Sequence, residues 1–196
     1  INPANDDEFY VSCDMSELFH STDYGNSYSQ IHHSRLQVFS TSTYEFTNHP
    51  DIAYSNFNDG NDGYPVKTTD GGNTWEKKVL STVEGDFGFQ IQFVDINNGW
   101  LLIFNFSTQS ASFLRTTDGG NNWAPFTGAG IFYFVDANIG WSYYGSGLNG
   151  SEPPYKILRT SNGGTGWTEQ FSDNAAGGYN AMYFSDLNNG WIVGDS

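Results

Sequence analysis

The sequence predicts an all-β protein built from repeated four-stranded antiparallel sheets. Three observations lead to this fold class. Two short motifs recur in a fixed order along the 196 residues. Aromatic residues make up 17% of the chain and glycine occurs 23 times, a mixture that suits short strands joined by tight turns better than helices. Apolar residues alternate, or gather in runs of strand length, and no segment shows a convincing helical pattern.

The first motif, which we call the box, has the pattern [S/T]-x-[D/N]-x-G-x-x-[W/Y]. It occurs at residues 21–28, 68–75, 116–123 and 160–167. Glycine supplies backbone conformations with positive φ, while the Asp or Asn and the leading Ser or Thr accept N–H groups of the turn. The closing aromatic ring packs between strands. The box therefore predicts a structural hairpin turn, formed by Ser21, Asp23, Gly25, Tyr28, Thr68, Asp70, Gly72, Trp75, Thr116, Asp118, Gly120, Trp123, Thr160, Asn162, Gly164 and Trp167.

The second motif, Phe-x-Asp-x-x-x-Gly-Trp, occurs at residues 93–100, 134–141 and 184–191. Two motifs alternating at this spacing indicate a unit of about four strands, the size of a β-propeller blade. Residues 100–104 form an apolar run, as expected of a strand sandwiched between neighbouring blades. We expect one domain over 1–196, an arc of about four blades cut from a larger propeller. Its units are a partial blade at 1–35, blades at 44–80, 88–127 and 131–171, and a partial blade at 179–196.

The charge of the chain argues against two classes of binding partner. The chain has 7 basic and 22 acidic residues, a net charge of −15. This disfavours a nucleic-acid backbone and an anionic membrane surface as partners. No apolar run approaches the roughly 18 residues that cross a bilayer. The chain starts at Ile1 without a leader pattern, so we expect a removed leader or a fragment. Cys13 stands alone, so no intrachain disulfide forms and the compartment stays open.

Residues 56–63 are rich in oxygen ligands and glycine, as calcium loops are. Asn58, Asp59 and Asp62 are the candidate calcium ligands, and an ordinary polar hairpin loop is the preferred alternative. No other cofactor is expected. His32 and His33 are adjacent, so a strand would point them to opposite faces and they make a poor metal pair. His20 and His49 have no visible partner.

The boxes resemble the Asp-box, or BNR, repeats of sialidase-like β-propellers. This superfamily includes sialidases, xyloglucan-active glycoside hydrolases of family 74, sortilin-type receptors and photosystem II assembly factors of the Ycf48 type. In these families the box is mainly a structural turn away from the central pocket, so the resemblance implies fold and not activity. The second motif looks most like the Ycf48-type repeat. Residues 10–20 are similar to the family 74 segment that carries a catalytic aspartate, and the resemblance places Asp14 there.

Whether the chain is an enzyme stays open at this stage. If it is one, the resemblance implies a glycoside hydrolase, which needs two carboxylates flanking the scissile bond, roughly 5–9.5 Å apart. Asp14 is the one candidate, and no second carboxylate can be identified. Sialidases grip their substrate with three arginines, and this chain has Arg35, Arg115 and Arg159. However, Arg115 and Arg159 both stand just before a box, which marks them as structural residues that lie along a neighbouring strand or pair with an acid.

The sequence therefore favours a secreted, cell-surface or periplasmic propeller that recognises a glycan or a protein without catalysis, since propeller loops stand on a rigid support. The first alternative is a family 74-like or sialidase-like hydrolase that uses Asp14. The second is a Ycf48-type assembly factor, a family expected to present a basic patch, whereas this chain has few basic residues. Further blades or an anchoring domain outside this segment are expected.

Overall fold

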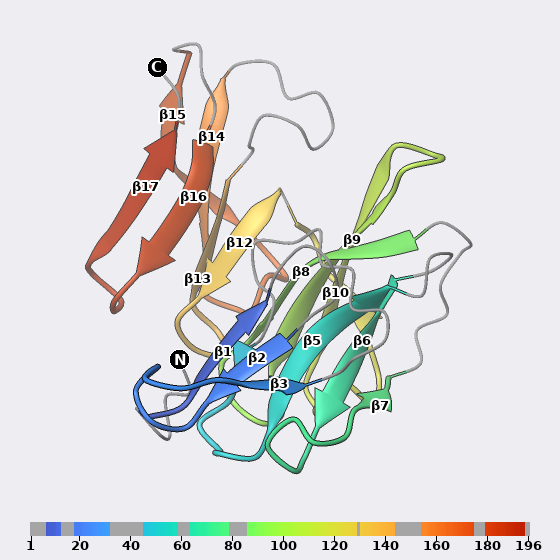
Figure 1. Ribbon diagram of the computed structural model, residues 1–196. Helices are drawn as coiled ribbons and strands as arrows, with labels where there is room; N and C mark the ends of the chain where they lie inside the picture. Colours follow the sequence, from blue (N-terminus) through green and yellow to red (C-terminus); the bar gives the residue numbers. More distant parts are fainter. Residues whose placement is uncertain are drawn as a thin grey trace.

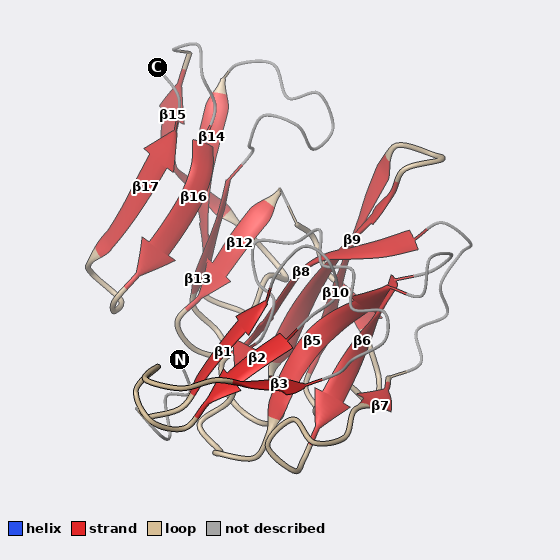
Figure 2. Ribbon diagram, in the orientation of Figure 1, coloured by secondary structure: helices blue, strands red, loops and turns tan. Residues whose placement is uncertain are grey.

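A computed structural model describes residues 7–12, 18–31, 45–58, 63–78, 86–128, 130–143, 154–174 and 179–194. This part of the chain is all β, as predicted, and its strands pair antiparallel in sequence order within each sheet (Figure 2). None of these residues belongs to a helix long and apolar enough to cross a membrane.

The strands form five sheets, which we call blades 1 to 5. Blade 1 contains β1 (Phe9–Ser12), β2 (Leu18–Ser21) and β3 (Ser29–Ile31). Blade 2 contains β4 (Glu45–Phe46), β5 (Ala53–Asn58), β6 (Gly63–Thr68) and β7 (Glu76–Lys77). Blade 3 contains β8 (Asp86–Phe93), β9 (Gly99–Asn105), β10 (Ser110–Thr116) and β11 (Ala124–Pro125). Blade 4 contains β12 (Ile131–Phe134), β13 (Gly140–Tyr143), β14 (Tyr155–Thr160) and β15 (Thr168–Asp173), and blade 5 contains β16 (Tyr179–Phe184) and β17 (Gly190–Gly194).

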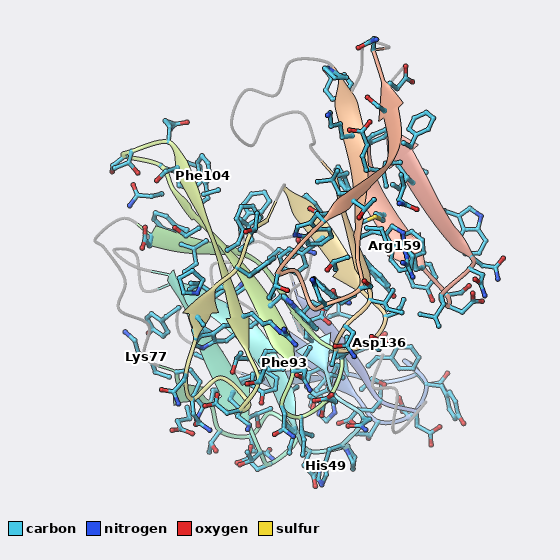
Figure 3. The ribbon with its side chains drawn as sticks, turned by 180° about the vertical axis from the view of Figure 1, so that it is seen from behind. His49, Lys77, Phe93, Phe104, Asp136 and Arg159 are labelled. Atoms are coloured by element: carbon cyan, nitrogen blue, oxygen red, sulfur yellow. The ribbon has the colours of Figure 1, made fainter. Side chains whose placement is uncertain are left out.

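Successive blades lie side by side in an open propeller arc (Figure 1). The first strands of blades 2 to 5 are innermost, because β4 contacts β8, β8 contacts β12, and β12 contacts β16. In Figure 3, Phe93 lies among these sheets, whereas Lys77 lies at one side and His49 at the lower end of the molecule. The predicted partial propeller of four-stranded blades is confirmed.

The apolar core lies between blades. Strand β9 is buried along its whole length, and Trp100, Leu101 and Leu102 have no exposed surface. Two clusters divide its side chains between the neighbours on either side. Because its side chains alternate between two covered faces, β9 needs apolar residues at successive positions. The apolar run at residues 100–104 is explained in this way.

One aromatic contact is repeated from blade to blade. A ring on the second strand of one blade stacks on a phenylalanine of the next blade's first strand. The pairs are Tyr54–Phe93, Trp100–Phe134 and Trp141–Phe184, with centroids 3.4, 3.7 and 3.7 Å apart. In blade 1, Tyr10 packs on Phe46 at 5.1 Å. The repeated motifs thus encode the interface between blades as well as the turns.

The residue before each box lies over the same second-strand ring. Lys67 lies 5.2 Å from the centroid of Tyr54, Arg115 lies 5.5 Å from that of Trp100, and Arg159 lies 5.6 Å from that of Trp141. Strand pairing places each cation directly opposite its ring, where the ring quadrupole attracts it. The two periodic arginines therefore lie along a neighbouring strand, the first of the two roles predicted for them.

His20 holds the same place in blade 1, and the expectation that it lacks a partner is wrong. Its ring stacks on Tyr10 at 4.3 Å, and its Nε2 lies 2.7 Å from Oε1 of Glu8. The pairing of β1 with β2 places His20 opposite Tyr10, a contact that the sequence alone does not predict.

Candidate functional site

The box has the geometry of a self-contained turn. In the third copy, the Thr116 hydroxyl donates to Asp118 (2.9 Å) and accepts the N–H of Gly120 (2.9 Å). The Asp118 carboxylate also accepts the backbone N–H of Asn122 at 2.9 Å. Gly120 has φ of +80°, and the equivalent glycines of the other three copies also have positive φ. The same hydroxyl-to-Asp or hydroxyl-to-Asn bond closes the other copies, at Ser21–Asp23, Thr68–Asp70 and Thr160–Asn162.

These hydrogen bonds decide the chemistry of the box carboxylates. The side chain and backbone of Asn122, together with the Thr116 hydroxyl, lower the pKa of Asp118 to about 2. Similar bonds, led by those from Ser27 and Thr74, lower the pKa of Asp23 and Asp70. A carboxylate held ionised by the turn is a poor proton donor near neutral pH. The box carboxylates therefore serve the turn, in which Asp118 accepts the Thr116 hydroxyl and the backbone N–H of Asn122.

The closing aromatic residues of the box are half-buried against neighbouring groups. Trp75 donates its indole N–H to the carbonyl of Gly72 at 3.1 Å, and Trp123 meets Phe93 edge-on at 6.1 Å. Trp167 donates to the carbonyl of Thr127. Tyr28 in blade 1 is 50% exposed, so the closing aromatic residue of the first box is the least buried of the four.

The structure predicts a selective cost for breaking the box. Replacing Thr116 with valine leaves the buried N–H of Gly120 without its acceptor. We expect the free energy of unfolding to fall by about 1–3 kcal/mol, measured by urea denaturation. Thr117→Val, at the exposed neighbouring position, is the matched control and is expected to stay within about 0.5 kcal/mol of the parent. Equal losses in both variants would contradict the assigned role.

A cavity of about 390 Å³ lies between the innermost strands. Each of the four innermost strands contributes to its wall. The lining residues are Glu45 of β4, Gln90 and Gln92 of β8, Ile131, Phe132 and Tyr133 of β12, and Asn180, Ala181 and Met182 of β16. It is the place where residues from four blades converge, which makes it the candidate functional site.

Two glutamines fix one wall of the cavity. Gln90 donates to the carbonyl of Phe132 at 2.7 Å and accepts its N–H at 3.1 Å. Gln92 makes the same pair of bonds with Phe134, at 2.9 and 2.8 Å. Each side-chain amide thus pairs with a backbone amide of the next blade as a strand residue does. These bonds hold β12 beside β8.

Glu45 occupies the place of Gln92 one blade earlier. Each precedes the phenylalanine that stacks on the previous blade, Phe46 and Phe93 respectively. The backbone N–H of Phe93 donates to the Glu45 carboxyl, as the N–H of Phe134 donates to Gln92. Burial raises the pKa of Glu45 to about 8. At neutral pH the side chain is therefore mainly the neutral acid, which has the shape and the bonding groups of a glutamine.

An exposed aromatic surface begins beside the cavity. Tyr133 in the wall contacts Tyr183 at 5.5 Å, and Tyr183 lies 6.3 Å from Trp191 with the rings 22° apart. Trp191 holds in blade 5 the place that Trp100 and Trp141 hold in blades 3 and 4, yet it is 60% exposed and Tyr183 is 55% exposed. Neither ring is covered by a phenylalanine within the described ranges.

Several predicted site residues lie outside the described residues. Asp14, the candidate catalytic carboxylate, is one of them, as are Asp59 and Asp62. Asn58 is described only as the last residue of β5. The catalytic and calcium assignments therefore stay predictions. Among the residues that the structure describes, no three His, Cys, Asp or Glu side chains gather as a metal site.

The cavity residues were missed by sequence reasoning. Gln90 and Gln92 alternate with apolar residues, a pattern that normally indicates a solvent-facing side of a strand. The available signal was the shared position of Glu45 and Gln92, each directly before a phenylalanine and three residues before an Asn or Asp.

No protein-family model and no curated protein sequence matches the chain. Among solved structures, a xyloglucanase of glycoside hydrolase family 74 from Xanthomonas campestris matches with a TM-score of 0.58 and 17% identity, over 81% of this chain and 26% of that one. The chain thus spans about a quarter of the xyloglucanase. A YCF48 structure described as bound to a D1 peptide matches with a TM-score of 0.52 and 15% identity, over 97% of this chain and 72% of that one. Both are β-propeller proteins, and identities this low show the fold alone.

Proposed function

We propose that this chain is a non-catalytic recognition module whose central cavity receives a segment of a protein partner. The observation that carries the proposal is the convergence of four innermost strands on one cavity, with a wall fixed by the bonds of Gln90 and Gln92. A preformed wall lowers the cost of binding, because the ligand alone has to be ordered.

The size of the cavity supports a short segment as the ligand. About 390 Å³ lies in the usual range of small-ligand pockets, roughly 300–1,000 Å³. Such a volume accommodates one or two side chains, and the rest of a partner would lie over the blade edges. A protein of the same fold has been solved with a bound peptide, which is the reason to test peptides first.

The remaining assignments belong to the same proposal. We take the four boxes as Asp-box repeats and the second motif as a repeat of the Ycf48 type, on the motif residues alone. A net charge of −15 supports a secreted, cell-surface or periplasmic protein. Calcium at Asn58, Asp59 and Asp62 is supported by the ligand types in that loop.

Glycan recognition is the second candidate function, and the exposed pair Tyr183 and Trp191 favours it. Two nearly parallel rings that are more than half exposed offer faces on which sugar rings stack. The hydrolase alternative with Asp14 predicts cleavage of xyloglucan or sialosides that Asp14→Asn abolishes. If the intact protein cleaved neither substrate, the hydrolase alternative would be excluded.

A peptide-display selection tests the proposal. We expect peptides enriched on the parent protein to lose at least tenfold in affinity on Ala181→Trp, because the indole fills the cavity. Ala124→Trp, on exposed β11 outside the cavity, is the matched control and is expected to bind like the parent. Peptides that bind Ala181→Trp unchanged, or a selection that enriches none, would contradict the proposal. A glycan array in which binding is lost in Trp191→Ala would support the second candidate instead.

A further inference from the structure

We infer that the cavity takes a positively charged side chain, a lysine or arginine of the bound segment, seated on the carboxyl of Glu45. The inference rests on the proposed function and names the ligand chemistry of the same site.

The charge of the cavity wall favours a cationic ligand. Glu45 is the one ionisable carboxyl among its described lining residues, and none of these is lysine, arginine or histidine. Removing a carboxylate from water is costly, and for Glu45 this cost outweighs the opposing effect of the positive N-terminus, so the neutral acid is favoured. A cation brought by a ligand supplies a partner inside the cavity and favours the ionised form.

The other lining residues of the cavity suit the stem of a basic side chain. Ile131 and Met182 offer apolar surface to the methylene stem of a lysine or arginine, and Tyr133 offers an aromatic ring. The chain already uses this combination internally, where Arg115 lies 5.5 Å from the ring centroid of Trp100. The described lining residues of the cavity include the same ingredients, an aromatic ring and apolar side chains, but no lysine or arginine.

The electrostatic field of the whole molecule favours the same class of ligand. A net charge of −15 attracts basic segments and repels acidic ones before contact is made. An acidic ligand would also be repelled by the ionised carboxyl of Glu45 inside the cavity. Both effects select for the same ligand class.

Binding of a cation at this carboxyl is coupled to release of a proton. Because burial raises the pKa of Glu45 to about 8, the carboxyl must lose its proton before it pairs with the ligand at lower pH. Affinity therefore rises with pH, by up to about tenfold per unit, and levels off above pH 8.

The positive charge of the N-terminus lowers the pKa of Glu45 and is part of this dependence, whereas the tyrosines that face the carboxyl do not disturb it. Burial raises the pKa of Tyr133 on β12, so it stays neutral over the same range. Burial also raises the pKa of Tyr54, which pairs with Glu45 from β5. The lining residues of β8 and β16 do not titrate.

Short acetylated peptide amides test the inference on the intact chain. The probes are acetyl-Gly-Lys-Gly-amide, acetyl-Gly-Arg-Gly-amide and, as the uncharged control, the norleucine analogue of the lysine peptide. We expect the two basic peptides to bind at least tenfold more tightly than the norleucine peptide at pH 8 in an NMR titration. Their affinity should fall more than tenfold between pH 8 and pH 6. Calorimetry at pH 6.5 in two buffers of different ionisation enthalpy should report close to one proton released per peptide.

Glu45→Gln is the decisive variant, because it keeps the neutral shape of the acid and matches the natural Gln92. We expect it to remain folded, checked by its melting temperature, and to lose both the charge preference and the pH dependence. Equal binding of the norleucine peptide to the parent, or a charge preference retained in Glu45→Gln, would overturn the inference. If peptides bind at the cavity whatever their charge, the inference fails and the recognition function stands. If no peptide shifts the cavity resonances and Ala181→Trp changes nothing, both fail.

Discussion

Replacing Trp100 with alanine is expected to lower the free energy of unfolding by about 3–5 kcal/mol. Trp100 has no exposed surface, its ring stacks on Phe134 with centroids 3.7 Å apart, and Arg115 lies 5.5 Å from its centroid. Its indole N–H also donates to the carbonyl of Gly163 in the box of the next blade, at 3.1 Å. Truncation would open a void between blades 3 and 4 and leave that carbonyl unpaired.

Trp191→Ala is the matched control, because Trp191 holds the same place in the repeat and is 60% exposed. We expect this variant to lose no more than about 1 kcal/mol. Urea denaturation followed by circular dichroism measures both variants. Similar losses at the two positions would show that the repeated stacking does not carry the stability of the arc.

The free energy of unfolding is expected to depend on pH through Glu45. Its pKa is about 8 in the folded chain, against an ordinary value of 4.5. Between these two values the folded chain holds a proton that the unfolded chain has lost, so the free energy of unfolding falls as pH rises. The contribution is fully present below pH 4.5 and is lost as pH rises through about 8. Glu45→Gln removes this dependence.

The full shift corresponds to about 5 kcal/mol, and water that reaches the cavity reduces it. We therefore expect Glu45→Gln to be more stable than the parent by about 2–3 kcal/mol at pH 8.5 and nearly equal to it at pH 4.5. Gln92→Glu, the reverse change one blade later, should create a second dependence of the same sign. Thermal unfolding between pH 4.5 and 8.5 measures all three proteins, and parallel curves would contradict the assignment.

The box carboxylates affect the free energy of unfolding at acid pH, below the range in which Glu45 acts. Hydrogen bonds, led by those of Asn122, lower the pKa of Asp118 to about 2. Its stabilising contribution is present above the ordinary pKa and is lost as pH falls through about 2. Glu45→Gln should therefore change the alkaline side of the stability profile and leave the acid side as it is.

The fold was predictable because its determinants are local and repeated. The box closes within eight residues, so its turn chemistry is visible in the sequence. The position of Arg115 and Arg159 before a box was enough to mark them as structural, and each lies over a tryptophan on the paired strand. Trp191 repeats the motif of Trp100 and Trp141, and its exposure depends on what lies beside the blade, which the motif does not encode.

The candidate site was much less predictable, because it depends on contacts between distant segments. The side chains of Gln90 and Gln92 form hydrogen bonds to backbone groups 42 residues away. Their alternation with apolar residues instead predicts that this side of the strand faces solvent, which is wrong. Strand β4 is two residues long, too short to show any periodicity that would have marked Glu45. Asp14, the carboxylate chosen from sequence, lies outside the described residues and stays a prediction.

A titration of the Glu45 side-chain carboxyl carbon, followed by NMR, is the most direct test of the cation-binding cavity. We predict a midpoint near pH 8 in the free protein. Adding acetyl-Gly-Lys-Gly-amide should move this midpoint downward, because a bound cation favours the ionised carboxylate. A midpoint near the ordinary value of 4.5 that the peptide does not move would contradict a desolvated acid in the wall of a cation-binding cavity.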